Sequence, residues 1–141
     1  MKLRPATETL INDAMTSERP MVRGAGGLVT QARMDPAELR ARREYLGFTQ
    51  DALGVALARD GAPVRGDTIR RWESGRDPIP YRVPDQIEAV ERRTDAFIEA
   101  LRDNTDEQVF YDTDVEVRFI SIDWATARWW RHCIIRARAH G

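Results

Sequence analysis

The sequence predicts a mainly α-helical fold with a small C-terminal α+β extension. Apolar residues recur at helical spacing between residues 35 and 103, capping and stop residues divide that stretch into helices, and a period of two follows at 109–119. The 141 residues, 42% hydrophobic and 32% charged, have the composition and length of one globular domain with an appendage. We therefore expect a flexible arm at 1–34, a helical domain at 35–103 and a β-hairpin plus helix at 104–141.

The bulk composition excludes several classes of protein. No apolar run approaches the roughly 20 residues that a membrane-spanning helix needs, and the N-terminus lacks a signal-peptide apolar segment. Cys133 is the only cysteine, so no intrachain disulfide can form, and cytoplasmic residence is the default expectation. His132 and Cys133 are adjacent without metal-ligand spacing, so we expect neither a metal nor another cofactor.

The N-terminal arm has two interpretations. Thr7 can cap a helix of a turn or two, but Pro20 and the glycine-rich run 24–27 prevent its continuation. Met34 directly precedes the first strong helix start and would make a natural first residue. Alternatively, the arm carries its arginines onto a partner; these are Arg4, Arg19, Arg23 and Arg33.

Two helices are predicted at the start of the helical domain. Asp35 is a capping residue directly before a proline, and Glu38 stands three residues later, which indicates a helix from there to about Tyr45 or Leu46. Gly47 then provides a left-handed stop. Thr49 caps a second helix, Gln50 to about Arg59, with small apolar residues on one face.

Two further helices follow the turn residues at 60–63. The third starts at 66–68, runs through Glu73 and stops at Gly75, with Ile69 and Trp72 facing inward. The fourth runs from Pro84 to about Asp103 and has the most regular apolar face.

The C-terminal extension changes periodicity. Apolar residues alternate with polar ones at 109–111 and 115–119, which predicts a strand pair around the turn at 112–114. A last helix is capped by Ser121 or Asp123 and ends near Arg138. Asp112, Asp114 and Glu116 would share one strand face, where a solvated face is a commoner explanation than a metal or basic partner.

The residues LRARREYLGFTQDAL at 39–53, followed by DTIRRWESGRDPIP at 67–80, resemble the lambda-repressor/Cro-like (XRE-type) helix-turn-helix family. The resemblance covers about residues 35–101. It implies a helical domain that binds double-stranded DNA, with the helix around 65–74 in the major groove, and it implies a transcriptional regulator, most simply a phage or bacterial repressor.

Base-contacting positions carried over from the family hold Arg65, Gly66, Asp67 and Arg71. Arginine suits the guanine O6/N7 pair, and aspartate can accept from cytosine N4. The segment 58–63 makes the connection between the second and third helices about five residues longer than the family's usual turn. Arg71 has the firmest register, because Trp72 and Gly75 stand close to it in the motif.

Phosphate-contacting positions are the second predicted set. The resemblance gives Gln50 a phosphate contact and a bracing role. Thr49, which caps the same helix, is also expected to contact a phosphate. We expect Arg70 and Arg76 to face phosphates, with Arg43 as a weaker candidate. The simpler interpretation is that these arginines solvate a helical surface, with local acidic partners.

Two other function classes compete with a DNA-binding regulator. An antitoxin would use its C-terminal module to bind a protein toxin. An enzyme needs convergent carboxylates or a nucleophile–base pair, and no such set occurs, so we expect no enzymatic activity. Three tryptophans crowd the last helix and either fill the core or form a homodimer or protein-partner surface; they are Trp124, Trp129 and Trp130.

Overall fold

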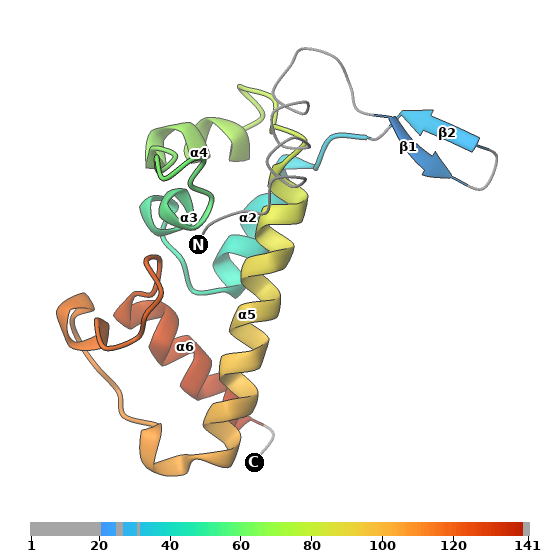
Figure 1. Ribbon diagram of the computed structural model, residues 1–141. Helices are drawn as coiled ribbons and strands as arrows, with labels where there is room; N and C mark the ends of the chain where they lie inside the picture. The colour runs from blue at the N-terminus through green and yellow to red at the C-terminus, as the bar shows by residue number, and fades with distance from the viewer. Residues whose placement is uncertain (1–20, 25–26, 31, 140–141) are drawn as a thin grey trace.

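The computed structural model describes residues 21–24, 27–30 and 32–139. The fold is mainly α, as predicted (Figure 1). The described α-helices are α2 (Pro36–Tyr45), α3 (Gln50–Ala56), α4 (Gly66–Glu73), α5 (Val83–Asp103) and α6 (Ala127–Arg138). Two 3-10 turns, η1 (Thr105–Glu107) and η2 (Asp114–Val117), lie between α5 and α6. No helix in the described ranges is both long and apolar enough to cross a membrane.

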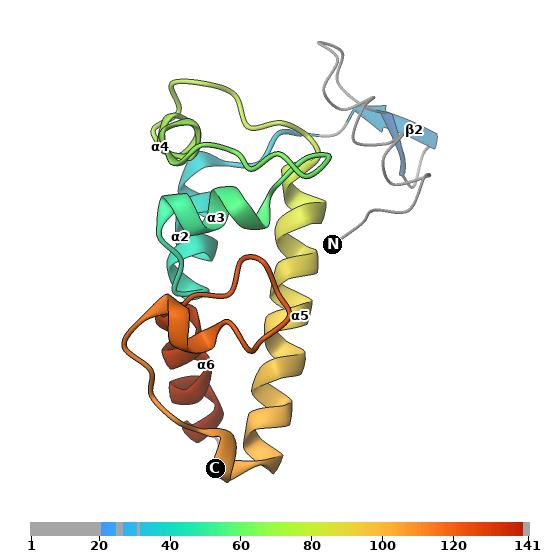
Figure 2. The same ribbon diagram turned by 60° about the vertical axis from the view of Figure 1, so that its left-hand side comes forward.

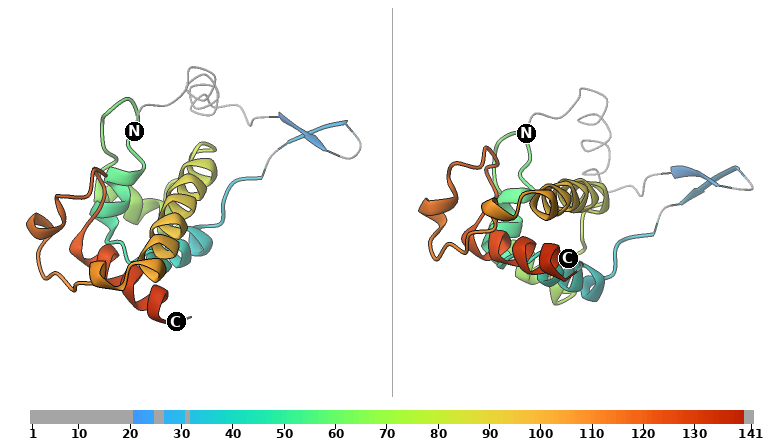
Figure 3. Two further views of the ribbon diagram at one scale, coloured as in Figure 1. Left: turned by 60° about the horizontal axis from the view of Figure 1, so that its bottom comes forward. Right: turned by 90° about the horizontal axis from the view of Figure 1, so that it is seen from below.

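The N-terminal arm contains one element that the sequence did not predict. Strands β1 (Met21–Gly24) and β2 (Gly27–Thr30) pair antiparallel and project from the helices (Figures 1 and 3). The expected helical turns near Thr7 lie outside the described residues. Arg33, at the end of the arm, donates to the Ile79 carbonyl at 2.9 Å and so contacts the segment that follows α4.

The start and end of α2 follow the predicted capping chemistry. The Asp35 carboxylate accepts from the Ala37 N–H at 2.7 Å, and Pro36 occupies the first turn. Beyond the helix, Gly47 has φ +76°, where glycine is favoured. A side chain there would also crowd His132 of α6, so this turn lies against the C-terminal helix.

Helix α3 is shorter than predicted. Thr49 caps it by accepting from the Ala52 N–H at 3.1 Å, but it ends at Ala56 rather than near Arg59. The chain reverses because Asp60 and Gly61 both have positive φ, and Arg59 and Ala62 exchange two backbone hydrogen bonds across the turn.

The connection between α3 and α4 is packed tightly onto α3. The Val64 N–H donates to the Gly54 carbonyl at 2.9 Å, and a Cβ on Gly54 would lie only 1.9 Å from the Val64 oxygen. Gly66, the first residue of α4, approaches the Asp51 side chain equally closely. Two glycines therefore allow α4 to pack against α3 despite the long connection.

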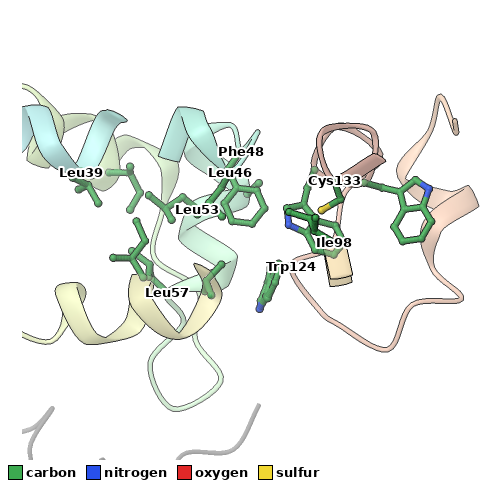
Figure 4. Close-up of a cluster of buried hydrophobic side chains, with 14 of the residues drawn as sticks. Leu39, Leu46, Phe48, Leu53, Leu57, Ile98, Trp124 and Cys133 are labelled. Atoms are coloured by element: carbon green, nitrogen blue, oxygen red, sulfur yellow. The ribbon is translucent and has the colours of Figure 1, made fainter. Parts of the chain in front are cut away.

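Helix α5 runs beside both the N-terminal helices and α6 (Figures 1 and 2), and the buried side chains form two connected parts of one core along it. The first lies between α2, α3, α4 and the start of α5, and the second between the end of α5 and α6 (Figure 3). Figure 4 shows Phe48 and Trp124 where these parts meet, with ring centroids 5.6 Å apart. Because α5 contributes to both parts, the C-terminal module at 104–139 shares one continuous core with the helical domain.

The predicted strand pair at 109–119 is wrong. Residues 109–113 are irregular, and η2 follows because the Thr113 and Glu116 side chains form a capping box. The carbonyls of Val109 and Tyr111 accept from the side chains of Trp130 and Arg131 instead of from a neighbouring strand.

Helix α6 begins later than predicted. Thr126 caps it by accepting from the Trp129 N–H at 3.1 Å, whereas Ser121 and Asp123 lie in the preceding turns. The predicted carboxylate trio does not share a strand face either. Asp114 accepts from the Ala127 N–H at the start of α6.

The three C-terminal tryptophans are part of the core. Trp124, Trp129 and Trp130 are 8%, 0% and 3% exposed, so they do not provide the homodimer or protein-partner surface considered from the sequence. The Trp129 indole N–H donates to the Thr94 hydroxyl at 3.1 Å, and Trp124 and Trp129 pack edge to face. These contacts satisfy the polar ends of large side chains inside the protein.

Candidate nucleic-acid interface

Helix α4 is anchored on one side and open on the other. Ile69 and Trp72 are buried, while most of the side chains between 65 and 71 on the opposite side reach solvent. Its end has the geometry of a Schellman motif: the Arg76 N–H bonds to the Arg71 carbonyl, and Gly75 has φ +79°. This end accounts for the Trp-Glu-Ser-Gly segment of the motif.

A buried network fixes α4 relative to α2 and α3. The Glu73 carboxylate, 5% exposed, accepts from Arg43 Nε at 2.6 Å and Nη2 at 3.0 Å. It also accepts from the Gln50 amide at 3.2 Å, while Arg43 Nη1 donates to the Phe48 carbonyl at 2.9 Å. The network joins the end of α2, the start of α3 and the last turn of α4.

The network changes the expectation for two predicted phosphate contacts. Arg43 is only 12% exposed and directs its donors to Glu73 and Phe48, so its role in the folded chain is to hold helices together. Gln50 fits the bracing role that the family resemblance implies. Its phosphate contact stays a prediction.

The arginines of α4 are paired with nearby carboxylates. Asp67 accepts from Arg70 at 2.5 Å, and Arg71 Nη1 lies 3.6 Å from the second Asp67 oxygen. Arg71 Nε lies 3.0 Å from Asp77 Oδ2, beyond the glycine stop. Arg70, followed by Arg71 and Arg65, keeps the pKa of the Asp67 carboxyl below its usual value.

The remaining predicted residues lie at the two ends of α4. Arg65 occupies the N-cap position, and Arg76 follows the glycine stop; both are exposed and neither forms an ion pair with another described residue. Gly66 is pressed against α3, so its contribution is a close helix–helix approach. Thr49 uses its hydroxyl as the cap of α3.

Four of the predicted arginines therefore lie on or beside α4: Arg65, Arg70, Arg71 and Arg76. Arg43 instead belongs to the buried network with Glu73. Sequence reasoning missed Asp77, which orients Arg71. The signal was present in the Gly-Arg-Asp-Pro segment, because a glycine stop turns the chain back toward the end of its helix. The simpler interpretation, in which the arginines solvate a helical surface, gave them Glu73 and Asp67 as local partners, whereas Glu73 is buried and pairs with Arg43 of α2.

Neither a metal centre nor a reactive thiol is found in the part of the chain that the structure describes. No set of three or more His, Cys, Asp and Glu side chains there is arranged to hold a metal ion. Cys133 is buried, and burial raises the pKa of its thiol to about 12.

Comparisons of this chain with known proteins found no matching protein-family model, no matching curated protein and no matching solved structure.

Proposed function

We propose that this chain is a lambda-repressor/Cro-like helix-turn-helix protein that binds specific DNA sequences and represses transcription. The observation that carries the proposal is the two-sided character of α4. Ile69 and Trp72 anchor it, and the Glu73 network braces it, while its other side presents arginines. A short rigid helix with exposed arginines is the element that DNA-reading proteins insert into the major groove.

The reading residues are Arg65, Asp67 and Arg71 in this proposal, with Gly66 allowing close approach at the helix start. Arg71 is the principal reader, because Asp77 and Asp67 already hold its guanidinium on the open side of α4. Exposed ion pairs of this kind contribute little to stability, because water and salt screen them. A bidentate guanine contact contributes about 1–3 kcal/mol of discrimination, so a base edge can replace these partners.

The positioning residues are Arg70, Arg76, Gln50 and Thr49. Arg70 and Arg76 flank the reader and are exposed, as phosphate contacts require. The formal net charge of −1 gives no general attraction to DNA. Affinity therefore depends on a few well-placed arginines rather than on the field of the whole protein.

The test is selection of bound duplexes from a randomised DNA library, followed by binding titrations of variants at several salt concentrations. Arg71→Ala should relax preference at one base position by about 1–3 kcal/mol. Arg76→Ala should weaken binding to all sequences and reduce the salt slope by about one. Arg92→Ala is the control, because Arg92 is an exposed arginine on α5, whereas α4 packs mainly on α2 and α3.

Two outcomes would overturn the proposal: recovery of no preferred sequence, or Arg71→Ala and Arg76→Ala variants that bind the selected site like the Arg92→Ala control. An antitoxin remains the second candidate. It requires a protein-binding surface on the C-terminal module, and exposed apolar side chains do gather at 109–119. Co-purification with a toxin, abolished by substitutions in that segment, would favour it.

A further inference from the structure

Exposed apolar side chains concentrate in one short segment of the C-terminal module. Among the described residues, four of the seven exposed large hydrophobic side chains fall within 109–119: Val109, Phe110, Val115 and Phe119, which we call the 109–119 patch. They are between 45% and 63% exposed. Clustering of this kind marks interaction sites, whereas single exposed apolar residues are ordinary.

The 109–119 patch is held in place from beneath. The Trp130 indole N–H donates to the Val109 carbonyl at 2.8 Å, and Arg131 donates to the Tyr111 carbonyl. Phe119 packs edge to face on Tyr111 and on Trp130, with centroids 5.8 and 5.9 Å away. The exposed side chains therefore extend from a backbone already fixed on α6, which reduces the ordering cost of binding.

The chain segment that carries most of the patch is acidic, although Arg118 follows it and the Arg138 guanidinium lies 4.8 Å from the centre of the Phe110 ring. Between residues 103 and 117 there are six carboxylates and no lysine or arginine. All six side chains belong to exposed residues, and none forms an ion pair with another residue in the part of the chain described; they are Asp103, Asp106, Glu107, Asp112, Asp114 and Glu116. The whole chain has a formal net charge of −1, so the residues outside this stretch carry a net charge of about +5 and the negative charge is local to it. This local charge is available to a partner, because no ion pair among the described residues neutralises it.

We propose that the 109–119 patch binds a protein segment that presents apolar side chains flanked by lysine or arginine. Apolar burial supplies the driving force, and charge complementarity selects the partner and speeds encounter. DNA, RNA and anionic lipid surfaces carry the same sign of charge as the patch. Two copies packed patch to patch would oppose their own carboxylates. The proposal is independent of DNA binding and is tested without DNA.

The probe is an 18-residue amphipathic Leu/Lys helical peptide, and its Leu/Glu counterpart is the charge control. Fluorescence anisotropy of the labelled peptides should show saturable binding of the Leu/Lys peptide alone, weakening as salt rises. Val115→Ser/Phe119→Ser should weaken it at least tenfold. Ile135→Ser is the matched control, since Ile135 is 59% exposed but lies among the arginines of α6.

A second variant keeps the test interpretable if loss of Phe119 disturbs the fold. Asp106→Asn/Glu107→Gln/Asp112→Asn removes three exposed charges and should also weaken binding at least tenfold with unchanged circular dichroism. Equal binding of both peptides, no binding by the parent chain, or equal losses in Ile135→Ser would overturn the proposal. Binding of the chain to phosphatidylserine vesicles would overturn the proposal as well, if the Val115→Ser/Phe119→Ser variant abolished it. Self-association in sedimentation runs that the same variant abolished would also overturn it.

Discussion

Replacing Glu73 by alanine tests the buried network that braces α4. The substitution removes the acceptor for two hydrogen bonds from Arg43 and one from Gln50. Removing one partner of a buried ion pair costs about 3–5 kcal/mol, because the other charge is left uncompensated. We expect about 3 kcal/mol here, since Arg43 keeps its bond to the Phe48 carbonyl and is 12% exposed.

The measurement is urea unfolding followed by circular dichroism and tryptophan fluorescence. Glu88→Ala is the matched control, because the Arg92–Glu88 pair is 72% and 58% exposed and should contribute less than about 1 kcal/mol. A further variant, Arg43→Met/Glu73→Leu, removes both charges and should recover much of the loss. If Glu73→Ala is no more destabilising than Glu88→Ala, the brace does not hold α4.

Three further predictions concern single residues. Gly54→Ala should lower the free energy of unfolding by more than about 1 kcal/mol, although alanine normally favours a helix interior, because its Cβ would meet the Val64 oxygen at 1.9 Å; a chemical denaturation curve checks this. Cys133, whose pKa is raised to about 12 by burial, should react with a disulfide reagent only after unfolding, with rapid labelling of the native protein as the contrary result. Burial, followed by the charge of Arg136, lowers the pKa of His132, so the folded state binds its proton less readily than the unfolded chain does. Stability should therefore be unaffected above about pH 6.5 and fall as the pH decreases below that value. Unfolding curves at pH 7.5 and 6.0 should show a smaller fall in His132→Gln, and an equal fall would contradict the reasoning.

Elements defined by neighbouring residues could be predicted from the sequence. The start of α2 follows from Asp35 and Pro36, and the end of α4 follows from Gly75, because caps and left-handed stops are local chemistry. The 109–119 segment could not be predicted in the same way. Its alternation matches a half-buried strand, but side chains of α6 bind its carbonyls, and that contact depends on the tertiary fold.

In the candidate interface, too, local features could be predicted from the sequence and long-range contacts could not. That Ile69 and Trp72 point inward followed from three-residue spacing, and both are buried. The partners of the arginines did not follow, because Arg43 meets Glu73 across 30 residues and Arg71 meets Asp77 only once the chain turns back. Patterns of periodicity identify faces of helices, whereas ion pairs depend on the arrangement of helices in space.

Because the chain reverses at 59–62, the position of α4 does not depend on how many residues the connection between α3 and α4 contains. The two ends of the reversal are joined by backbone hydrogen bonds, and Val64 is tied to Gly54 before α4 begins. Residues added at the tip would therefore lengthen a closed loop without shifting the helix that follows. The same loop is a convenient attachment point for a reporter: Ala62→Cys would place an exposed thiol a few residues from α4, with the native thiol of Cys133 shielded in the core.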